Sequence, residues 1–427
     1  MSAAIGVVGL SHLGTVVAAC LAADGAVVRG VDADGGVVAA LTAGQAAVHE
    51  PGLDVLLKFA GRSFTTDYER LAGCDVVLVA CDTVTDADNR ADLSVVEAHL
   101  DRALPWLAPE TALVLMSQVP VGYTRALAER LRARRPDFRG SLTYWVETLV
   151  IGEAVSRFRA PDRIILGGPA RAWTPDPRLA ALVARFGCPV LTMTYESAEL
   201  TKAAINFYLA TSVTFANTLA DLCERTGASM RDIVPALRSD PRIGARAYLR
   251  PGLGLGGGNL ERDLVHLRDL ARRVGITPAL VELVLAQSAA RYAWLRRAVE
   301  HHLLAGRERP RLALWGVAYK KNTASTRNAV SLRLIDDLRD RAQIVAYDPA
   351  AAAPAGHGVR TAATALAAAE GSDGLVVLTD WDEFAAIDLR AVARALRTPV
   401  VVDAAWAIDG AAACAAGLTY VGIGEAA

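Results

Sequence analysis

Residues 4–14 read Ala-Ile-Gly-Val-Val-Gly-Leu-Ser-His-Leu-Gly, and this stretch decides how the first part of the chain folds. Its apolar beginning predicts a buried β-strand, and a helical pattern follows it. The run Gly9-Leu10-Ser11-His12-Leu13-Gly14 therefore lies at a strand-to-helix turn, as the dinucleotide fingerprint requires. In such a turn the glycines allow a close approach of pyrophosphate, and the amides at the start of the helix attract the anion.

Ser11 replaces the middle glycine of this fingerprint, so the turn needs support from a second feature. Asp32 provides it, because it ends the next predicted strand, residues 26–32. A carboxylate there can accept a hydrogen bond from the adenosine ribose and would repel a 2′-phosphate, which favours NAD over NADP. The alternative is a surface Asp that caps the next helix. His12 is expected to be a loop residue near phosphate rather than a catalyst. The predicted cofactor residues in this region are Gly9, Ser11, His12, Leu13, Gly14 and Asp32.

Composition limits the class of protein. The chain has 427 residues, of which 53% are hydrophobic and 21% charged, as in globular proteins with two or three domains of about 150 residues. Its 45 basic and 46 acidic residues give no electrostatic footprint for nucleic acid or a membrane surface. No apolar run approaches the ~18 residues of a membrane span, and the N-terminus lacks the features of a signal peptide. The 6 cysteines are scattered, which predicts no disulfide framework, no metal site and a cytoplasmic location.

The order of apolar runs predicts an α/β fold. Strand-like runs alternate with helical patterns up to RIILGG (163–168), which is typical of a parallel sheet buried on both faces. From Ser197 a helical pattern continues to a C-cap at Gly227, and strand-like runs resume near residue 310. We therefore expect two Rossmann-like doubly wound domains, 1–195 and 306–427, joined by a helical central domain, 196–305, with a long central helix. The alanine-rich residues 350–369 are expected to be a connection followed by a helix.

Several further segments resemble motifs of the UDP-glucose/GDP-mannose dehydrogenase family, in the family's order and over nearly the whole chain. Residues 81–94 resemble PTPT…ADLS, 117–122 resemble STVPVG, and 147–163 resemble NPEFLxEG…DRIxxG. Residues 242–244 and 252–263 resemble RIG and GFGGSCFPKD, 316–327 resemble GxAFKxNTxDxRES, and 380–384 resemble WDEF. Lys202 and Asn206 match the lysine and asparagine of the family's central helix.

The resemblance implies an enzyme that passes hydride from a nucleotide-linked sugar to NAD. Family enzymes oxidise C6 twice, and a cysteine thiolate traps the aldehyde before the second oxidation. It also implies that Lys202 stabilises an alkoxide, with Asn206 on the same helix face, and that Asp263 accepts the proton, usually through water. Only 4 lysines can be counted in the sequence, so a lysine at this position suggests that an amine is needed there.

The remaining residues implied by the resemblance fall into two groups. Thr83, Gln118 and Arg327 are added to the cofactor site. The expected substrate-binding residues are Glu147, Thr148, Leu149, Lys202, Asn206, Arg242, Tyr248, Gly254, Gly256, Gly257 and Lys320. Glu147 is also expected to take part in catalysis, and Arg242 to reach the sugar phosphates from a neighbouring subunit. The glycine-rich loop 252–258 is expected to line the substrate with backbone, its alternative being a flexible connector.

The chain departs from the family at the residues of the second oxidation. Asn259 stands at the position of the catalytic cysteine, and an amide cannot form the covalent adduct at neutral pH. Gln118 replaces a threonine that helps to hold the catalytic water, and Ile151 replaces the second glutamate of NPEFLxE. Ala405 replaces an arginine that reaches across the family's dimer to the nucleotide-sugar.

The leading hypothesis is a single two-electron oxidation of a nucleotide-activated sugar, to an aldehyde or a ketone, in specialised sugar or antibiotic biosynthesis. The alternatives are a redox-neutral epimerase that uses NAD transiently, a full UDP-sugar 6-dehydrogenase, and an inactive nucleotide-sugar-binding homologue. A homodimer through the central helix is expected by analogy. The sugar and its base remain open.

Overall fold

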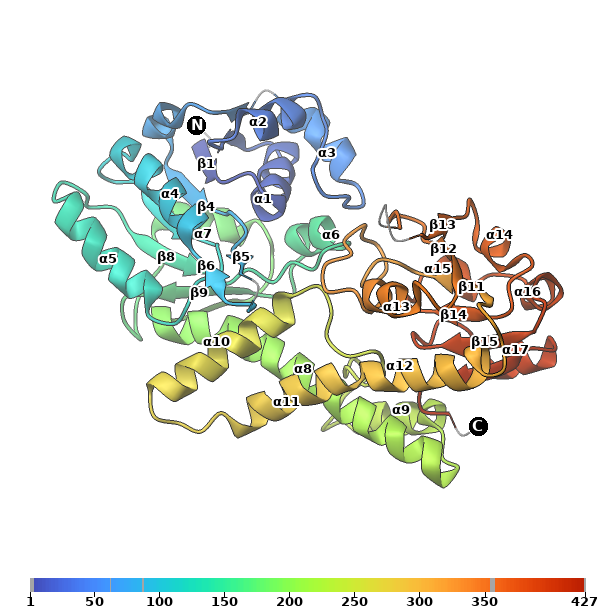
Figure 1. Cartoon of the computed structure of the whole chain (residues 1–427). Helices are drawn as coiled ribbons and strands as arrows, with labels where there is room; N and C mark the ends of the chain where they lie inside the picture. The colour runs from blue at the N-terminus through green and yellow to red at the C-terminus, as the bar shows by residue number, and fades with distance from the viewer. Residues whose placement is uncertain (1–3, 62, 87, 354–357, 426–427) are drawn as a thin grey trace. The chain divides into compact units, whose positions relative to one another are not determined.

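The predicted N-terminal strands form one large sheet, whose order is β10-β9-β8-β7-β4-β1-β2-β3. Figure 1 shows the computed structural model, which describes residues 4–61, 63–86, 88–353 and 358–425. The chain divides into two compact units, Met1–Ile205 and Asn206–Ala427. The three-domain division of the sequence stays a prediction. Residues 1–3, and residues 354–357 of the predicted alanine-rich connection, lie outside the described part.

Unit 1 alternates strands and helices as the apolar runs predict. Its strands are β1 (Ala4–Val8), β2 (Val27–Val31), β3 (Phe64–Thr65), β4 (Val76–Val79), β5 (Val84–Thr85), β6 (Ala91–Asp92), β7 (Ala112–Leu115), β8 (Leu142–Trp145), β9 (Ile164–Gly168) and β10 (Val190–Thr194). Its helices are α1 (His12–Ala23), α2 (Gly35–Thr42), α3 (Leu53–Ala60), η1 (Tyr68–Gly73), α4 (Ser94–Ala103), η2 (Leu104–Trp106), α5 (Tyr123–Arg134), α6 (Ala154–Arg159) and α7 (Pro177–Ala184).

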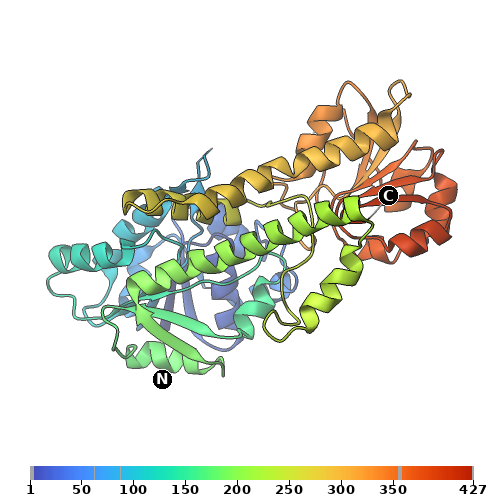
Figure 2. The ribbon, with the colours of Figure 1, turned by 90° about the horizontal axis from the view of Figure 1, so that it is seen from below.

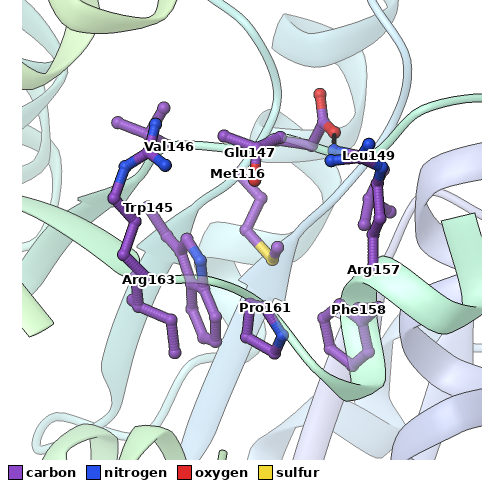
Figure 3. Close-up of a pocket in the computed structure, with 11 residues that line it drawn as sticks. Met116, Trp145, Val146, Glu147, Leu149, Arg157, Phe158, Pro161 and Arg163 are labelled. Atoms are coloured by element: carbon purple, nitrogen blue, oxygen red, sulfur yellow. Dashed lines mark hydrogen bonds between the residues drawn. The ribbon is translucent and has the colours of Figure 1, made fainter. Parts of the chain in front are cut away.

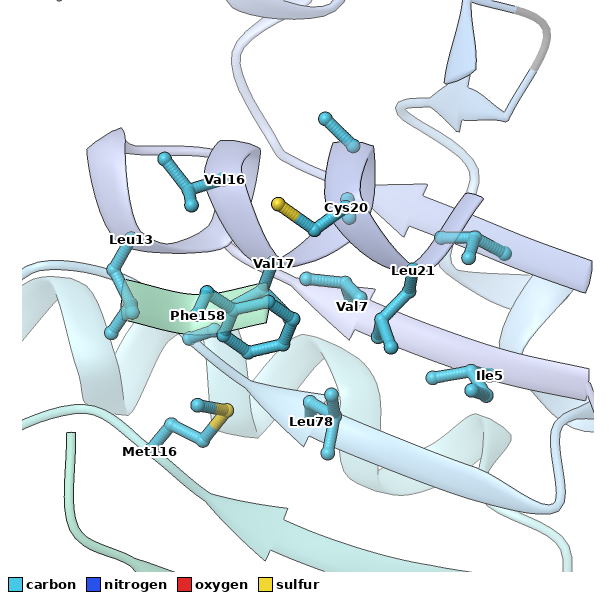
Figure 4. Packing of buried hydrophobic residues seen from close by; sticks show 14 of the residues in the cluster. Ile5, Val7, Leu13, Val16, Val17, Cys20, Leu21, Leu78, Met116 and Phe158 are labelled. Carbon is cyan, nitrogen blue, oxygen red and sulfur yellow. The ribbon is translucent and has the colours of Figure 1, made fainter. Parts of the chain in front are cut away.

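Two apolar layers cover the faces of this sheet. Ile5 and Val7 of β1 face a core built with α1, α3, α6 and α7, and Figure 4 shows α1 lying over the strands there. Val8 faces the opposite core, which includes side chains of α4 and α5. Because successive side chains of a strand point to opposite faces, both faces must be apolar, and this explains the continuous apolar runs of the sequence.

One strand pair departs from the parallel arrangement expected. β9 is antiparallel to β8, with Tyr144 opposite Gly167, whereas the other pairs of this sheet are parallel. The connection between them contains only the six-residue helix α6, so the chain is not carried back to the opposite edge before β9 begins. The expectation of a purely parallel sheet was therefore wrong at this pair.

The long central helix is present as α8 (Tyr195–Thr226), close to the predicted 197–227 (Figure 2). It is 32 residues long and contains neither proline nor glycine. Gly227 follows it with a φ of 76°, the left-handed conformation in which a glycine ends a helix at little cost.

Unit 2 contains the remaining helices and a parallel sheet of order β13-β12-β11-β14-β15-β16. Its strands are β11 (Arg311–Trp315), β12 (Gln343–Tyr347), β13 (Arg360–Thr361), β14 (Leu375–Val377), β15 (Val400–Asp403) and β16 (Thr419–Gly422). Its helices are α9 (Met230–Ser239), α10 (Asn259–Arg273), α11 (Ala279–Ala290), α12 (Tyr292–Val299), η3 (Glu300–Leu304), α13 (Val330–Leu338), α14 (Ala365–Ala369), α15 (Asp382–Ala385), α16 (Leu389–Ala395) and α17 (Gly410–Ala415).

This sheet is also covered on both faces, by α9, α12 and α13 on one side and by α14, α16 and α17 on the other. The predicted fold class, two doubly wound domains with a helical segment and a long central helix, is confirmed. Among the described residues, none of the helices is long and apolar enough to cross a membrane.

Candidate functional site

The turn between β1 and α1 has the geometry of a dinucleotide-binding turn. Gly9 has a φ of 83°, a conformation that side chains other than glycine rarely adopt. A Cβ on Gly14 would overlap the carbonyl oxygen of Gly9, so helix and strand can pack this closely only if residue 14 is glycine. Both glycines of the fingerprint are therefore required by the backbone.

Ser11 fits this turn although it replaces a glycine. Its φ is -65°, which any residue can adopt, so the side chain adds no backbone strain. The Ser11 hydroxyl accepts a hydrogen bond from the amide of Asp82 at 2.7 Å, which ties the turn to the loop after β4. The altered fingerprint therefore keeps its shape.

Asp32 lies at the end of β2 and supports the same turn. One of its carboxylate oxygens accepts a hydrogen bond from the amide of Leu10 at 2.6 Å, and the other accepts one from the amide of Asp34 at 2.9 Å. The helix cap that was the alternative role for Asp32 is made by Asp34, whose side chain accepts from the amides of Gly36 and Val37. A carboxylate has further lone pairs, so Asp32 can still accept a hydrogen bond from a ribose hydroxyl. The turn, the start of α1 and Asp32 together fit NAD.

Two buried side chains beside this turn were missed by the sequence analysis. His99 of α4 lies with its Nε2 3.9 Å from a carboxylate oxygen of Asp32, and its Nδ1 is 2.6 Å from the hydroxyl of Tyr68. Tyr68, His99 and Asp32 are all buried. They come from η1, α4 and β2, so no local spacing in the sequence reveals the cluster.

Glu50 is a third missed residue, and it holds His12. Its buried carboxylate lies 3.0 Å from Nε2 of His12 and accepts hydrogen bonds from the amides of Gly152 at 2.8 Å and Ala154 at 2.6 Å. Burial by itself would raise the pKa of Glu50, but the bonds from His12 and the two amides outweigh it and lower the pKa. The dinucleotide turn is thus joined to the segment that resembles NPEFLxEG.

Thr83 and Gln118, both predicted to contact the cofactor, are brought together within unit 1. The hydroxyl of Thr83 donates to the carbonyl oxygen of Gln118 at 2.6 Å. They follow β4 and β7, which are neighbours in the sheet. Both residues therefore lie at the carboxyl edge of the sheet, where ligands of doubly wound folds bind.

Glu147 and Lys202 form an ion pair in unit 1. The ammonium of Lys202 lies 3.2 Å from one carboxylate oxygen of Glu147, and the other oxygen accepts a hydrogen bond from the amide of Leu149. Lys202 is buried, and Glu147 is partly buried, with 17% of its side chain exposed. The side chains of Met116, Trp145, Phe158 and Pro161 line a hollow beside this segment (Figure 3). Its volume of about 20 Å³ holds no more than a water molecule, so it is not the place for a sugar.

Asn206 and Asp263 form the corresponding pair in unit 2. The side-chain amide of Asn206 donates to one oxygen of Asp263, and the guanidinium of Arg262 donates to the other at 3.1 Å. Only 1% of Asp263 is exposed to solvent. The predicted residues thus contact each other directly, and Arg262, which was not predicted, balances the charge of the carboxylate.

Asn259 is the first residue of α10, directly after Gly258 at the N-cap. Its side chain is exposed. A thiolate at this place would be stabilised by the positive end of the helix, which is how a reactive cysteine is activated. The residue at this helix start is an amide, and its assignment to the position of the family's nucleophile stays a prediction.

The glycine loop before α10 is anchored at several points. The amide of Gly252 donates to the side-chain oxygen of Asn217 at 2.8 Å, and the amide of Gly257 donates to the carbonyl of Arg327 at 3.1 Å. A Cβ on Gly257 would press against the ring of Tyr319. These contacts hold the loop against neighbouring segments of unit 2, while its role in lining the substrate stays a prediction.

The other predicted substrate residues lie at separate places in unit 2. Lys320 has its ammonium 5.8 Å from the ring centroid of Tyr319, next to the glycine loop. Arg242 is 89% exposed at its side chain and pairs with Asp240, and Tyr248 is exposed. Gly254 has a φ of 93° and lies against Ser288, whereas Gly256 lies against Tyr319.

Ala405 lies where the family's arginine was expected, and another cation is near it. The guanidinium of Arg250 donates to the carbonyl oxygen of Ala405 at 2.5 Å and to Asp380 at 2.8 Å. Arg250 was not among the predicted residues, because it precedes the glycine loop outside the matched motif.

Three family models match the chain. They are described as the NAD binding domain, the central domain and the UDP binding domain of the UDP-glucose/GDP-mannose dehydrogenase family, and they match residues 3–182, 196–288 and 313–410.

Individual relatives and solved structures agree with these models. A UDP-glucose 6-dehydrogenase from Pseudomonas aeruginosa is 35% identical, with 98% of this chain and 97% of the relative covered. One from Haloferax volcanii is 33% identical, with 93% and 96% covered. Among solved structures, a UDP-glucose dehydrogenase from Pyrobaculum islandicum has a TM-score of 0.85 at 27% identity, covering 100% of this chain and 98% of that one.

Proposed function

This chain belongs to the UDP-glucose/GDP-mannose dehydrogenase family and is an NAD-dependent nucleotide-sugar dehydrogenase, and we propose that it oxidises its sugar in a single two-electron step. The predictions of the family, the enzyme class and NAD are confirmed by the three matched domains and the relatives. What remains a proposal is how many hydrides each sugar yields, and which residues of the chain carry out the reaction.

Asn259 is the observation that carries the proposal. Oxidation of an aldehyde by hydride transfer needs a tetrahedral adduct, and in the family a thiolate provides it. The amide at the start of α10 has no nucleophilic electron pair of that kind at neutral pH. None of the six cysteines of the chain lies between residues 224 and 413. The sugar should therefore leave as a carbonyl compound.

The residues at the positions that bind and activate the hydrolytic water in the family also differ in this chain. Ile151 offers an apolar side chain where the family's second glutamate is expected. Gln118 takes the place of a threonine, with its backbone carbonyl bound by Thr83. Loss of these groups is consistent with an enzyme that has no thioester to hydrolyse.

The groups needed for a single oxidation are present. In this step the hydroxyl oxygen loses its proton, the carbon loses a hydride, and a C=O double bond forms. NAD, when bound, accepts the hydride. We infer that Lys202, held by Glu147, stabilises the negative charge that develops on the oxygen, and that Asp263, held by Asn206 and Arg262, receives the proton through water.

The names of the relatives suggest the first substrate to test. UDP-glucose is the substrate in the names of the Pseudomonas and Haloferax relatives, and the C-terminal family model is that of a UDP binding domain. An aldehyde or ketone product suits a later transamination in specialised sugar or antibiotic biosynthesis. We assign the enzyme to the cytoplasm on the composition of its sequence.

We also infer a homodimer that pairs through α8. Tyr208, Phe215 and Leu222 are exposed by 69%, 48% and 53%, and they are spaced seven residues apart on one face of the helix. An apolar stripe of this period is typical of helices that pack against another helix.

Counting NADH decides how many oxidations take place. The purified protein is incubated with NAD and UDP-glucose or another UDP-sugar, NADH is followed by absorbance, and the sugar product is identified by mass. We expect one NADH per sugar and a product that is trapped by a hydroxylamine as an oxime.

Each other outcome points to one of the alternatives. Two NADH per sugar with a carboxylate product would refute the single step. Inversion of the configuration at one sugar carbon, without net formation of NADH, would indicate an epimerase. No turnover, with binding of the nucleotide-sugar retained, would indicate an inactive homologue.

A further inference from the structure

His99 places a titratable group beside the carboxylate that is expected to recognise the ribose of NAD. It lies on α4, and 7% of the residue is exposed to solvent, against 8% of Asp32. Its Nε2 is 3.9 Å from Oδ2 of Asp32. This distance is too long for a hydrogen bond, but a charge on the ring would act on the carboxylate strongly because both groups are buried.

Tyr68 holds the ring of His99 from the side of Nδ1. Burial raises the pKa of Tyr68, so its phenol keeps its proton, and the phenol oxygen is hydrogen-bonded to Nδ1 of His99 at 2.6 Å. Burial also lowers the pKa of His99, so the ring is neutral at pH 7. With Nδ1 bonded to Tyr68, the other ring nitrogen, Nε2, faces Asp32.

We propose that His99, oriented by Tyr68, is a positioning residue for Asp32 and makes the choice between NAD and NADP depend on pH. The proposal rests on the inferred role of Asp32 in the proposed function. With the ring neutral, the negative charge of Asp32 repels a 2′-phosphate. When the ring gains a proton, the pair has no net charge and the repulsion weakens.

The charged and titratable groups around His99 come from several elements. Asp32 faces it from the end of β2, Tyr68 from η1 and Arg102 from its own helix, and Arg102 acts to lower the pKa of His99. The neighbouring β4 and η2 consist of Val76–Val79 and Leu104–Trp106, which have no titratable side chain. Cys81 follows β4, and burial raises the pKa of its thiol to about 11.

The direction of the effect follows from the lowered pKa of His99. Above the ordinary histidine value of 6.5 the ring is neutral, and selection of NAD is at its strongest. As the pH falls through the lowered pKa, which lies below 6.5, the ring becomes charged, and the ratio of the Kd for NADPH to the Kd for NADH should fall by about three- to tenfold.

Binding titrations at several pH values test the proposal. The Kd of NADH and of NADPH is measured by fluorescence between about pH 5.5 and 8 for the wild type, His99→Gln and Tyr68→Phe. Gln keeps a donor near the place of Nε2 but does not titrate, so this variant should bind NADH as the wild type does at pH 8 and keep a high ratio at low pH. Tyr68→Phe removes the hydroxyl that holds Nδ1 of His99, so the ring is held less firmly beside Asp32 and the fall in the ratio should become smaller.

Two controls separate this proposal from other effects. The 2′-phosphate of NADPH also titrates near pH 6, but it does so equally in every variant. The effect of His99 is therefore the difference in the pH dependence of the Kd ratio between the wild type and His99→Gln. His302→Gln, a histidine of η3 in unit 2 with a pKa lowered by burial, should keep the wild-type slope.

The results also distinguish this proposal from the proposed function. A wild-type slope retained in His99→Gln would overturn the role of His99. In that case, loss of the preference for NADH in Asp32→Asn, measured in the same assay, would mean that the cofactor site itself is retained. Failure of the wild type to bind NADH at any pH would refute the cofactor site itself.

Discussion

Lys202 is the residue whose replacement tests the proposed chemistry most directly. Its ammonium is buried and held by Glu147 at 3.2 Å. Lys202→Met removes the charge that would stabilise the developing alkoxide, and we expect kcat to fall by about 10²- to 10³-fold while NADH still binds. Steady-state kinetics and fluorescence titration measure the two quantities.

Lys58→Met is the matched control, because Lys58 is an exposed residue of α3. It should leave kcat within about twofold of the wild type, as expected for a surface position. Loss of rate in both variants, or in neither, would contradict the role given to Lys202.

Single residues also mark the limit of what the sequence can predict. Asp32 and the glycines were found because they are close in sequence to the turn they serve. Glu50 and His99 were not, since Glu50 contacts the amide of a residue 102 positions away and His99 contacts Tyr68 over 31 positions. Pairing over such separations is created by the sheet topology and leaves no spacing in the sequence.

At the scale of elements, Glu199 of α8 stabilises the start of α5. Its two carboxylate oxygens accept hydrogen bonds from the amides of Gly122 at 2.6 Å and Thr124 at 2.7 Å. Glu199→Ala leaves these buried amides without an acceptor, so we expect the free energy of unfolding to fall by about 2–3 kcal/mol. Chemical denaturation followed by circular dichroism measures it.

Glu196→Ala on the same helix is the control for this prediction. Glu196 pairs with Arg125 at the surface, and such pairs contribute only about 0–1 kcal/mol. Equal losses of stability in the two variants would show that Glu199 is not a special support of α5.

Elements were predictable where their apolar runs were long. β1, β2, β4, β7 and β9 coincide with such runs, and α8 with an uninterrupted helical pattern. β3 has two residues, and β10 lies at the edge of the sheet with exposed side chains, so neither had an apolar run to mark it. The direction of β9 depends on the path of the connection before it, which the strand's own residues do not encode.

At the scale of the whole molecule, each unit has its own apolar cores. The cores of unit 1 contain no residue beyond Ala198, and those of unit 2 begin at Ala210. We therefore expect two transitions in calorimetric unfolding. NAD should stabilise only unit 1, raising its free energy of unfolding by about 2.7 kcal/mol at a concentration 100 times its Kd.

Asp32→Asn provides the control, because it should reduce the shift caused by NAD without merging the two transitions. A single transition, or an equal shift of both by NAD, would contradict the idea that the units unfold separately.

The anchored glycine loop of unit 2 has an entropic consequence. Asn217, Arg327 and Tyr319 hold its backbone in place through contacts within the chain. The freedom of these residues is therefore lost when the chain folds and not when a ligand arrives. A molecule that binds along the loop should show a small entropic penalty, so differences in affinity between related ligands should appear mainly in their binding enthalpies.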